Sequence, residues 1–203
     1  MKSLLLKDYY VLSKQALWYL FIIICYSFIP VQNAILGFPI IFGVMLPITA
    51  VSYDERSKWD ILMKMMPYQS FQAVFSKYIL GYISMFAAGV ISAVIQTLLM
   101  VFRDKTMDPV YYISLTAVFL MGCLIQAIYL PLVFRWGVEK ARIIFYAVIA
   151  AMTALSMIIV EFIKAYSLND KSVIVMLAVI LLLVVLSNVF SIKITSVIYS
   201  KRE

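Results

Sequence analysis

The chain has 203 residues, of which 65% are hydrophobic and only 13% are charged, and its mean hydropathy is +1.02. These values exclude a soluble globular domain of this length. The formal net charge is +7, but the basic residues are spread along the chain and do not form one cluster with interleaved aromatic residues. We therefore expect no nucleic-acid partner.

Five uncharged runs divide the sequence, at residues 15–53, 78–102, 109–134, 143–160 and 172–192. A membrane-spanning helix needs roughly 20 apolar residues, so the first run is long enough for two spans and each of the others gives one. Pro30 and Pro39 supply the break between the first two helices. The predicted fold class is an all-α integral membrane protein with six transmembrane helices in a single domain over residues 1–203.

In chain order, we expect a helix over 1–15 that lies in the membrane interface before the first span. Its apolar residues Leu4, Leu5, Tyr9 and Leu12 fall near one face. The alternative is a frayed tail. The remaining segments are expected to be helices 1 and 2 at 16–52, a polar segment at 53–77, helices 3 and 4 at 78–134, a loop at 135–142, helices 5 and 6 at 143–192, and a tail at 193–203.

The Lys and Arg residues predict the orientation, because basic residues near helix ends stay on the cytoplasmic side. If the N-terminus is cytoplasmic, four segments lie on the inner side, at 1–15, 53–77, 135–142 and 193–203. They contain 13 of the 17 basic residues, and the outer loops contain the other 4. The predicted protein is therefore multi-pass, with both termini in the cytoplasm.

The segment at 53–77 is the longest polar interruption of the sequence. Ser52 followed by Glu55 could form a capping box that starts a short helix, and Pro67 would end it. Four large apolar side chains recur there at helical spacing: Trp59, Leu62, Met63 and Met66. An amphipathic helix on the aqueous side of a membrane protein indicates a surface for a partner. The alternative is a helix that rests on lipid headgroups.

The predicted third span carries small and polar residues at four-residue spacing. Such strips let helices approach closely in lipid, where van der Waals packing drives their association. They could line a transport pathway or form a subunit interface, or they could serve ordinary packing within the chain. One strip contains Gly81, Gly89 and Ala93, and the next contains Ser84, Ala88, Ser92 and Gln96.

Catalytic and metal-binding patterns are missing from the sequence. There is no histidine, no phosphate-binding GxxxxGK[ST] and no HExxH. Cys25 and Cys123 both fall inside predicted spans, where buried thiols are expected. The predicted spans carry no acidic residue of the kind used in ion-coupled transport. We expect no enzyme activity and no cofactor in this chain, so energy for any transport would come from another chain.

The six predicted spans, the N-terminal interfacial helix and the segment DERSKWDILMKMMPYQSFQAVFSKY resemble the permease subunits of ABC-2 type transporters. The resemblance is strongest to the small Firmicutes permeases of the phenol-soluble modulin exporter group. That segment has an acidic pair, a Lys-Trp, large apolar residues, a Pro and a Lys-Tyr. Met65 and Met66 stand where the family usually has Ser and Leu. The matching residues are Asp54, Glu55, Lys58, Trp59, Leu62, Met65, Met66, Pro67, Lys77 and Tyr78.

The resemblance implies a plasma-membrane complex of two permease chains, as a homodimer, with two separate ATPase subunits that bind ATP and magnesium. It implies that the polar segment is a coupling helix seated on the ATPase. The residues assigned to this contact are Asp54, Glu55, Arg56, Lys58, Trp59, Leu62, Met63, Met66 and Pro67.

The interior is rich in Met, Phe and Tyr and suits export of an amphipathic or hydrophobic substrate such as a membrane-active peptide. Two alternatives remain: an immunity permease of the same architecture that removes antimicrobial peptides, and a membrane scaffold that recruits a cytoplasmic partner without transport.

Overall fold

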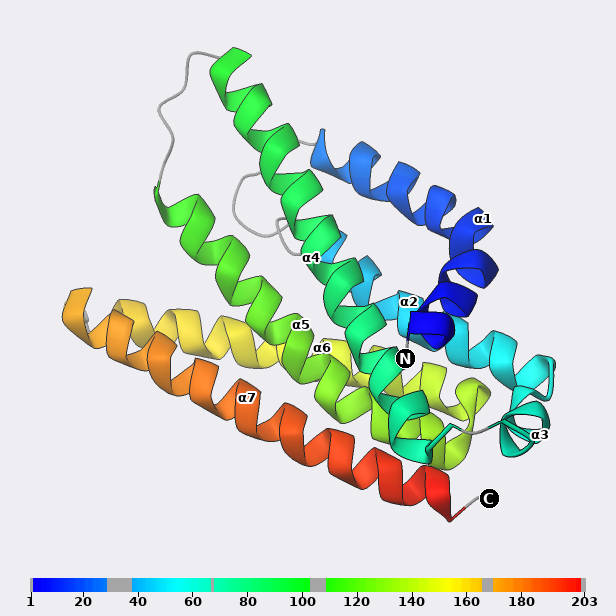
Figure 1. The fold of residues 1–203 in the computed structure, drawn as a ribbon. Coiled ribbons are helices and arrows are strands. Elements are labelled where there is room, and N and C mark those ends of the chain that lie inside the picture. Colours follow the sequence, from blue (N-terminus) through cyan, green and yellow to red (C-terminus); the bar gives the residue numbers. More distant parts are fainter. Residues whose placement is uncertain (1, 29–37, 67, 103–108, 166–169, 202–203) are drawn as a thin grey trace.

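The computed structural model describes residues 2–28, 38–66, 68–102, 109–165 and 170–201, and all regular structure in these residues is helical (Figure 1). This confirms the predicted all-α class. The helices are α1 (Lys2–Ser27), α2 (Phe38–Arg56), α3 (Trp59–Lys64), α4 (Ser70–Phe102), α5 (Pro109–Trp136), α6 (Val138–Ala165) and α7 (Asp170–Ser200).

Three helical stretches of the described chain are long and apolar enough to cross a membrane: Ser70–Phe102, Leu115–Trp136 and Ala178–Ser200. A fourth candidate is α1, if its two arms count as one broken span. The described residues therefore support three or four spans. The number six stays a prediction.

α1 is bent by 68° between the arms Ser3–Ser13 and Gln15–Ser27, near the predicted boundary between the interfacial helix and the first span. The first arm buries Leu4 and Leu12 and leaves Tyr10 exposed. One side of this arm therefore packs on the protein, which is not the behaviour of a frayed tail.

α2 and α4 approach each other closely in the core. Gly43 allows this approach, because a Cβ at this position would lie 2.7 Å from the Cα of Met85. Around this contact Ile40, Val44 and Met85 are buried in one hydrophobic cluster with residues of α5 and α7. Because glycine has no side chain, the two helix backbones can pack directly against each other here, as in other pairs of membrane helices.

The small and polar strips of α4 face other helices of the same chain. The Ser84 hydroxyl donates to the Gly43 carbonyl at 2.6 Å, the Gln96 amide donates to the Ser27 carbonyl at 2.7 Å, and Gly81 lies directly under the Gln126 side chain. The strips thus contact α1, α2 and α5, which favours intrachain packing over a pathway or a subunit interface. The buried members include Gly81, Ala88, Gly89, Ser92 and Gln96, and Ser84 and Ala93 are half-buried.

Polar side chains also join α4 to α7. The Tyr82 hydroxyl donates to the Asn188 side-chain oxygen at 2.6 Å, and the Asn188 amide donates to the Val184 carbonyl at 2.8 Å. The Tyr78 hydroxyl lies within hydrogen-bond distance of the Ser191 and Thr195 hydroxyls. These bonds satisfy polar groups that would otherwise be buried without partners.

The boundaries predicted at the aqueous ends were wrong in three places. Ser52 and Glu55 lie inside α2, so they form no capping box, and the short helix begins later, at Trp59. The helix that contains the third predicted span begins at Ser70, before the predicted start of that span at residue 78, and the predicted loop at 135–142 is helical except for Gly137. The cause is that helices continue past the hydrocarbon layer: the 33 residues of α4 measure about 50 Å.

The N-terminus, the α3 region and the C-terminus lie at one end of the bundle (Figure 1). The Ser3 hydroxyl lies 2.6 Å from the Tyr68 hydroxyl, and the Tyr199 hydroxyl lies 3.5 Å from the Met63 sulfur. The basic inner segments inferred from the sequence therefore meet at the same end. The side of the membrane on which this end lies stays a prediction.

Candidate functional site

α3 stands between two turns at the end of the bundle that carries both termini. The backbone reverses at Lys58, which has a φ of 52° and leads into α3 without a side-chain cap. A left-handed conformation is uncommon for a residue with a side chain. After α3, the amides of Met65 and Met66 donate back to the Leu62 and Met63 carbonyls. These turns hold α3 as a separate, short helix directly after α2.

One side of α3 packs against the bundle. Met63 is only 4% exposed, and its sulfur accepts from Tyr199 of α7. Trp59 is half-buried against the core, and the Lys7 ammonium lies 4.1 Å from the centre of its ring. Both residues were assigned to the partner contact from the sequence, but here they attach α3 to its own chain.

The other side of α3 and the turn that follows it carry four exposed apolar residues, which we call the outer face: Ile61, Leu62, Met65 and Met66, with exposed fractions of 55%, 47%, 80% and 39%. Leu62 and Met66 belonged to the predicted contact, whereas Ile61 and Met65 were missed as contact residues. Helical spacing predicts which residues are on the apolar side of the helix. It does not show which of them pack against the chain itself, as Met63 does, and which stay exposed.

Four charged residues form a network beside α3. The Lys77 ammonium contacts both Asp8 carboxylate oxygens at 2.7 and 2.8 Å and an Asp54 oxygen at 2.6 Å. The Lys7 ammonium contacts Asp54 at 2.5 Å and Asp8 at 3.2 Å. Two positive and two negative charges thus neutralise one another with little solvent contact, which is the condition under which buried charges are tolerated. The network joins α1, α2 and α4.

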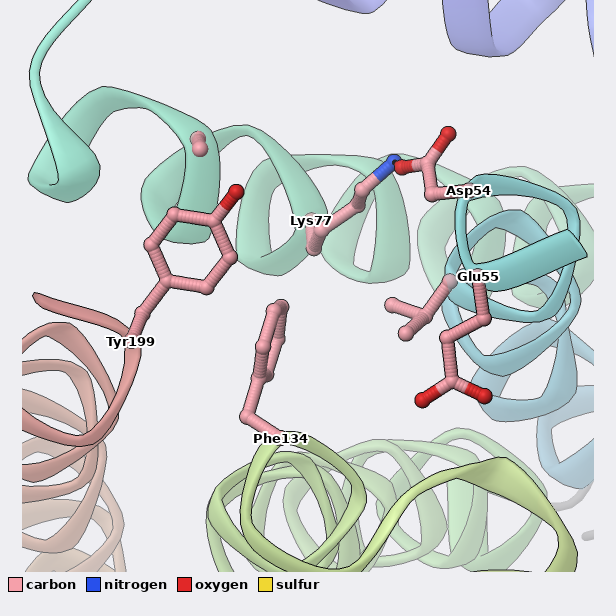
Figure 2. A pocket seen from close by; sticks show the side chains of 7 residues that line it. Asp54, Glu55, Lys77, Phe134 and Tyr199 are labelled. Atoms are coloured by element: carbon pink, nitrogen blue, oxygen red, sulfur yellow. Dashed lines mark ion pairs between the residues drawn. The ribbon is translucent and has the colours of Figure 1, made fainter. Parts of the chain in front are cut away.

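A small pocket lies next to this network, where α2, α4, α5 and α7 converge (Figure 2). Its volume is about 30 Å³, enough for water but far too small for a nucleotide or a transported molecule. The pocket is therefore a junction between helices. Its lining residues are Val51, Asp54, Glu55, Ala73, Lys77, Phe134 and Tyr199.

Glu55 connects the end of α2 to α6. Its carboxylate accepts from the Val138 amide at 3.3 Å, at the first residue of α6. Gly137 makes this approach possible, because it has a φ of 80° between α5 and α6 and glycine adopts that conformation without steric cost. A carboxylate at a helix N-terminus also interacts favourably with the helix dipole.

The chain matches the family model described as ABC-2 family transporter protein over residues 3–196. The chain belongs to the ABC-2 transporter family. No curated protein and no solved structure matches it. The more specific resemblance to the phenol-soluble modulin exporter group stays a prediction.

An ABC-2 family protein is the membrane component of an ABC transporter and works with an ABC ATPase. In this ABC-2 chain, the described residues contain no group of three or more His, Cys, Asp or Glu residues that could hold a metal ion.

The remaining predicted coupling residues have different positions in the structure. Arg56 and Lys58 have exposed side chains. Asp54 is only 15% exposed in its side chain and is paired with Lys7 and Lys77. Pro67 lies outside the described residues. The assignment of the whole set to the ATPase contact stays a prediction.

Proposed function

We propose that this ABC-2 family chain is the permease subunit of an exporter and that a separate ATPase docks on the outer face of α3. One observation carries the proposal. α3 and the turn after it present four exposed apolar side chains beside the charged network, at the end of the bundle where both termini lie. An apolar surface beside charged groups at an aqueous end is typical of a protein contact.

The chemistry of the outer face suits a partner that changes shape. Met65 and Met66 have flexible, polarisable side chains that adapt to a moving surface. Arg56 and Lys58 flank the outer face with exposed positive charge, and no ion pair joins either residue to the acidic side chains that the structure describes. Acidic residues on the ATPase would pair with them and determine the orientation of the two subunits.

The contacts at the end of α2 provide a route from α3 to the spans. A displacement of α3 acts on the end of α2 through the short turn at Lys58. The movement of α2 would then reach α1 and α4 through the ion pairs of Asp54, and it would reach α6 through the hydrogen bond of Glu55. The helices would then move as nearly rigid bodies between two packings. In this scheme two permease copies form a homodimer over two ATPase subunits, which bind ATP and magnesium.

The interior of the bundle supports an amphipathic or apolar substrate. Its described polar groups include amides and hydroxyls that are already bonded to neighbouring helices, such as Gln126, Asn188 and Thr195. The four described charges of the network lie beside α3. We propose a membrane-active peptide as the substrate, a six-span topology, and both termini in the cytoplasm of a Gram-positive cell.

The docking proposal can be tested by purifying the tagged chain from native membranes and identifying bound proteins by mass spectrometry. The matched variants are Leu62→Asp on the outer face and Met63→Ala on the packed face of the same helix. We expect an ABC ATPase with the wild-type chain and with Met63→Ala, and little or none with Leu62→Asp. Equal recovery of the ATPase with both variants would contradict docking at the outer face.

Transport is tested with the purified complex in liposomes and a fluorescent amphipathic peptide. We expect ATP-dependent movement of the peptide away from the ATPase side. A complex that assembles but moves no member of a broad peptide panel would contradict export and favour a scaffold. Protection of cells against added peptides, without secretion of a cellular product, would favour the immunity function.

A further inference from the structure

A second cavity, of about 210 Å³, lies between α1, α2, α5 and α6 and shares no lining residue with α3. Apolar side chains form one part of its wall, and hydroxyl and guanidinium groups form the other. Its lining residues are Tyr19, Met45, Ile48, Thr49, Tyr129, Arg142, Phe145 and Tyr146. The proposed function uses none of them.

The polar part of the wall offers hydrogen-bond donors without matching acceptors. Tyr129 is 1% exposed, and its buried hydroxyl has no hydrogen-bond partner. Such a group is costly unless something accepts its proton. The Thr49 hydroxyl is already used, since it donates to the Met45 carbonyl at 3.0 Å.

Arg142 adds a positive charge to the same wall. Its side chain is exposed, and none of the acidic side chains that the structure describes forms an ion pair with it. The Glu55 carboxylate does not line the cavity, and it already accepts from the Val138 amide. An unpaired guanidinium beside an unpaired hydroxyl favours an anionic oxygen ligand, and phosphate fits this pair of donors.

The position of the cavity favours a lipid over a free anion. In the described residues α1 and α6 flank the cavity without packing against each other, and we infer that this side of the cavity opens toward the surrounding membrane. Tyr146 is 65% exposed there, and tyrosine is enriched at the level of lipid headgroups. The apolar wall, with Met45, Ile48 and Phe145, is suited to the first carbons of an acyl chain.

We propose that this cavity binds the phosphate headgroup of an anionic membrane phospholipid, with Arg142 and the Tyr129 hydroxyl as donors. Basic pockets between membrane helices bind such headgroups in general. Only the assignment of this lipid to the inner leaflet rests on the orientation in the proposed function. The lipid would fill the space between α1 and α6 and hold two helices that do not otherwise contact each other.

The test uses the full-length chain in neutral detergent, with phosphatidylglycerol as the probe and phosphatidylcholine and inorganic phosphate as comparisons. Retained lipid is counted by native mass spectrometry, and lipid affinity is measured by the shift in melting temperature. Arg142→Gln removes the positive charge that lines the cavity. Lys140→Gln removes an equal charge two residues away, from an exposed side chain that does not line the cavity.

We expect phosphatidylglycerol to bind the wild-type chain and Lys140→Gln equally, and Arg142→Gln roughly tenfold more weakly. Equal losses in both variants would indicate general surface charge and overturn the proposal. Equal retention of phosphatidylcholine would also overturn it. An inorganic phosphate effect as large as that of the lipid would overturn the lipid assignment.

Tyr129→Phe provides a second variant that does not depend on charge. Because the hydroxyl has no partner in the chain, its removal should leave the melting temperature without lipid unchanged or slightly raised. The shift induced by phosphatidylglycerol should decrease. An unchanged shift would remove Tyr129 from the site and contradict the proposed donor pair. ATPase recovery with these variants should equal that of the wild-type chain, so failure here is distinguishable from failure of the docking proposal.

Discussion

The Lys77 ammonium lies 2.6 Å from an Asp54 carboxylate oxygen, and this contact holds the end of α2 against α4 (Figure 2). Asp54 is the third residue from the end of α2, and α3 begins three residues after that end. The same ammonium also binds Asp8 of α1. One lysine therefore joins α1, α2 and α4, and α2 and α4 are the helices that precede and follow the proposed docking helix α3.

Replacement of Lys77 by Met should destabilise the chain. The substitution leaves Asp8 and Asp54 with Lys7 as their only cation in the described network, and removing one partner from a buried ion cluster costs about 3 kcal/mol or more. The melting temperature in detergent measures this loss. Adding Asp8→Asn to Lys77→Met removes one unpaired charge and should restore part of the stability. A Lys77→Met chain that melts like the wild type would show that the network contributes no stability.

Gly43→Ala should separate α2 from α4. The new methyl group would lie 2.7 Å from the Met85 Cα and 2.8 Å from its amide nitrogen, and backbone atoms cannot rotate away as a side chain can. We expect a loss of about 1 to 3 kcal/mol in the free energy of unfolding.

Gly89→Ala is the matched control, because its nearest neighbour would be the Ile40 side chain at 3.9 Å. This variant should be neutral, or more stable by up to about 1 kcal/mol, since alanine favours the helix over glycine. Equal losses in Gly43→Ala and Gly89→Ala, measured by chemical denaturation, would be inconsistent with a close contact at Gly43.

Glu55→Ala should weaken the start of α6, because the Val138 amide would lose its acceptor. The expected cost is about 1 kcal/mol, as for other N-terminal caps. Glu55→Gln keeps an acceptor oxygen and should retain more of the stability. If Glu55→Ala melts normally but no longer binds the ATPase, Glu55 contacts the partner directly, as the sequence pattern suggested.

Tyr82→Phe should loosen the contact between α4 and α7, because the Asn188 oxygen loses the donor at 2.6 Å. Hydrogen bonds between membrane helices contribute about 1 kcal/mol on average or less, so a drop of a few degrees in melting temperature is expected. Tyr10→Phe is the control, since Tyr10 is 67% exposed and should melt as the wild type does. A larger drop for Tyr10→Phe than for Tyr82→Phe would be unexpected on this account.

Hydropathy predicted the class of the fold and the cores of α4, α5 and α7, because long uncharged runs require a membrane or a buried interior. It could not predict where those helices end. Lys77 and Arg135 lie inside α4 and α5, although each was placed at or beyond the end of a predicted span. A charged residue indicates that its surroundings are polar, but it does not indicate that a helix ends there, because a helix can continue from the membrane into water.

The candidate site was predicted only in part. The sequence identified the amphipathic helix and two of the four residues of the outer face, Leu62 and Met66. Met63 was assigned to the partner because spacing alone does not reveal which apolar side is covered by the chain itself. The pairing of Asp8 with Lys77, 69 residues apart, has no local signal. Contacts between distant segments, such as this one, required the three-dimensional structure.

Cross-linking from the outer face of α3 tests the central claim most directly. Met65→Cys places a thiol at the most exposed residue of that face, and Met63→Cys places one on the packed face. In native membranes, a thiol-reactive cross-linker should join residue 65, and not residue 63, to an ATP-binding subunit, and a membrane-impermeant external label should reach neither residue. Labelling of residue 65 from outside the cell, or a co-purified ATPase that never cross-links to it, would contradict the account.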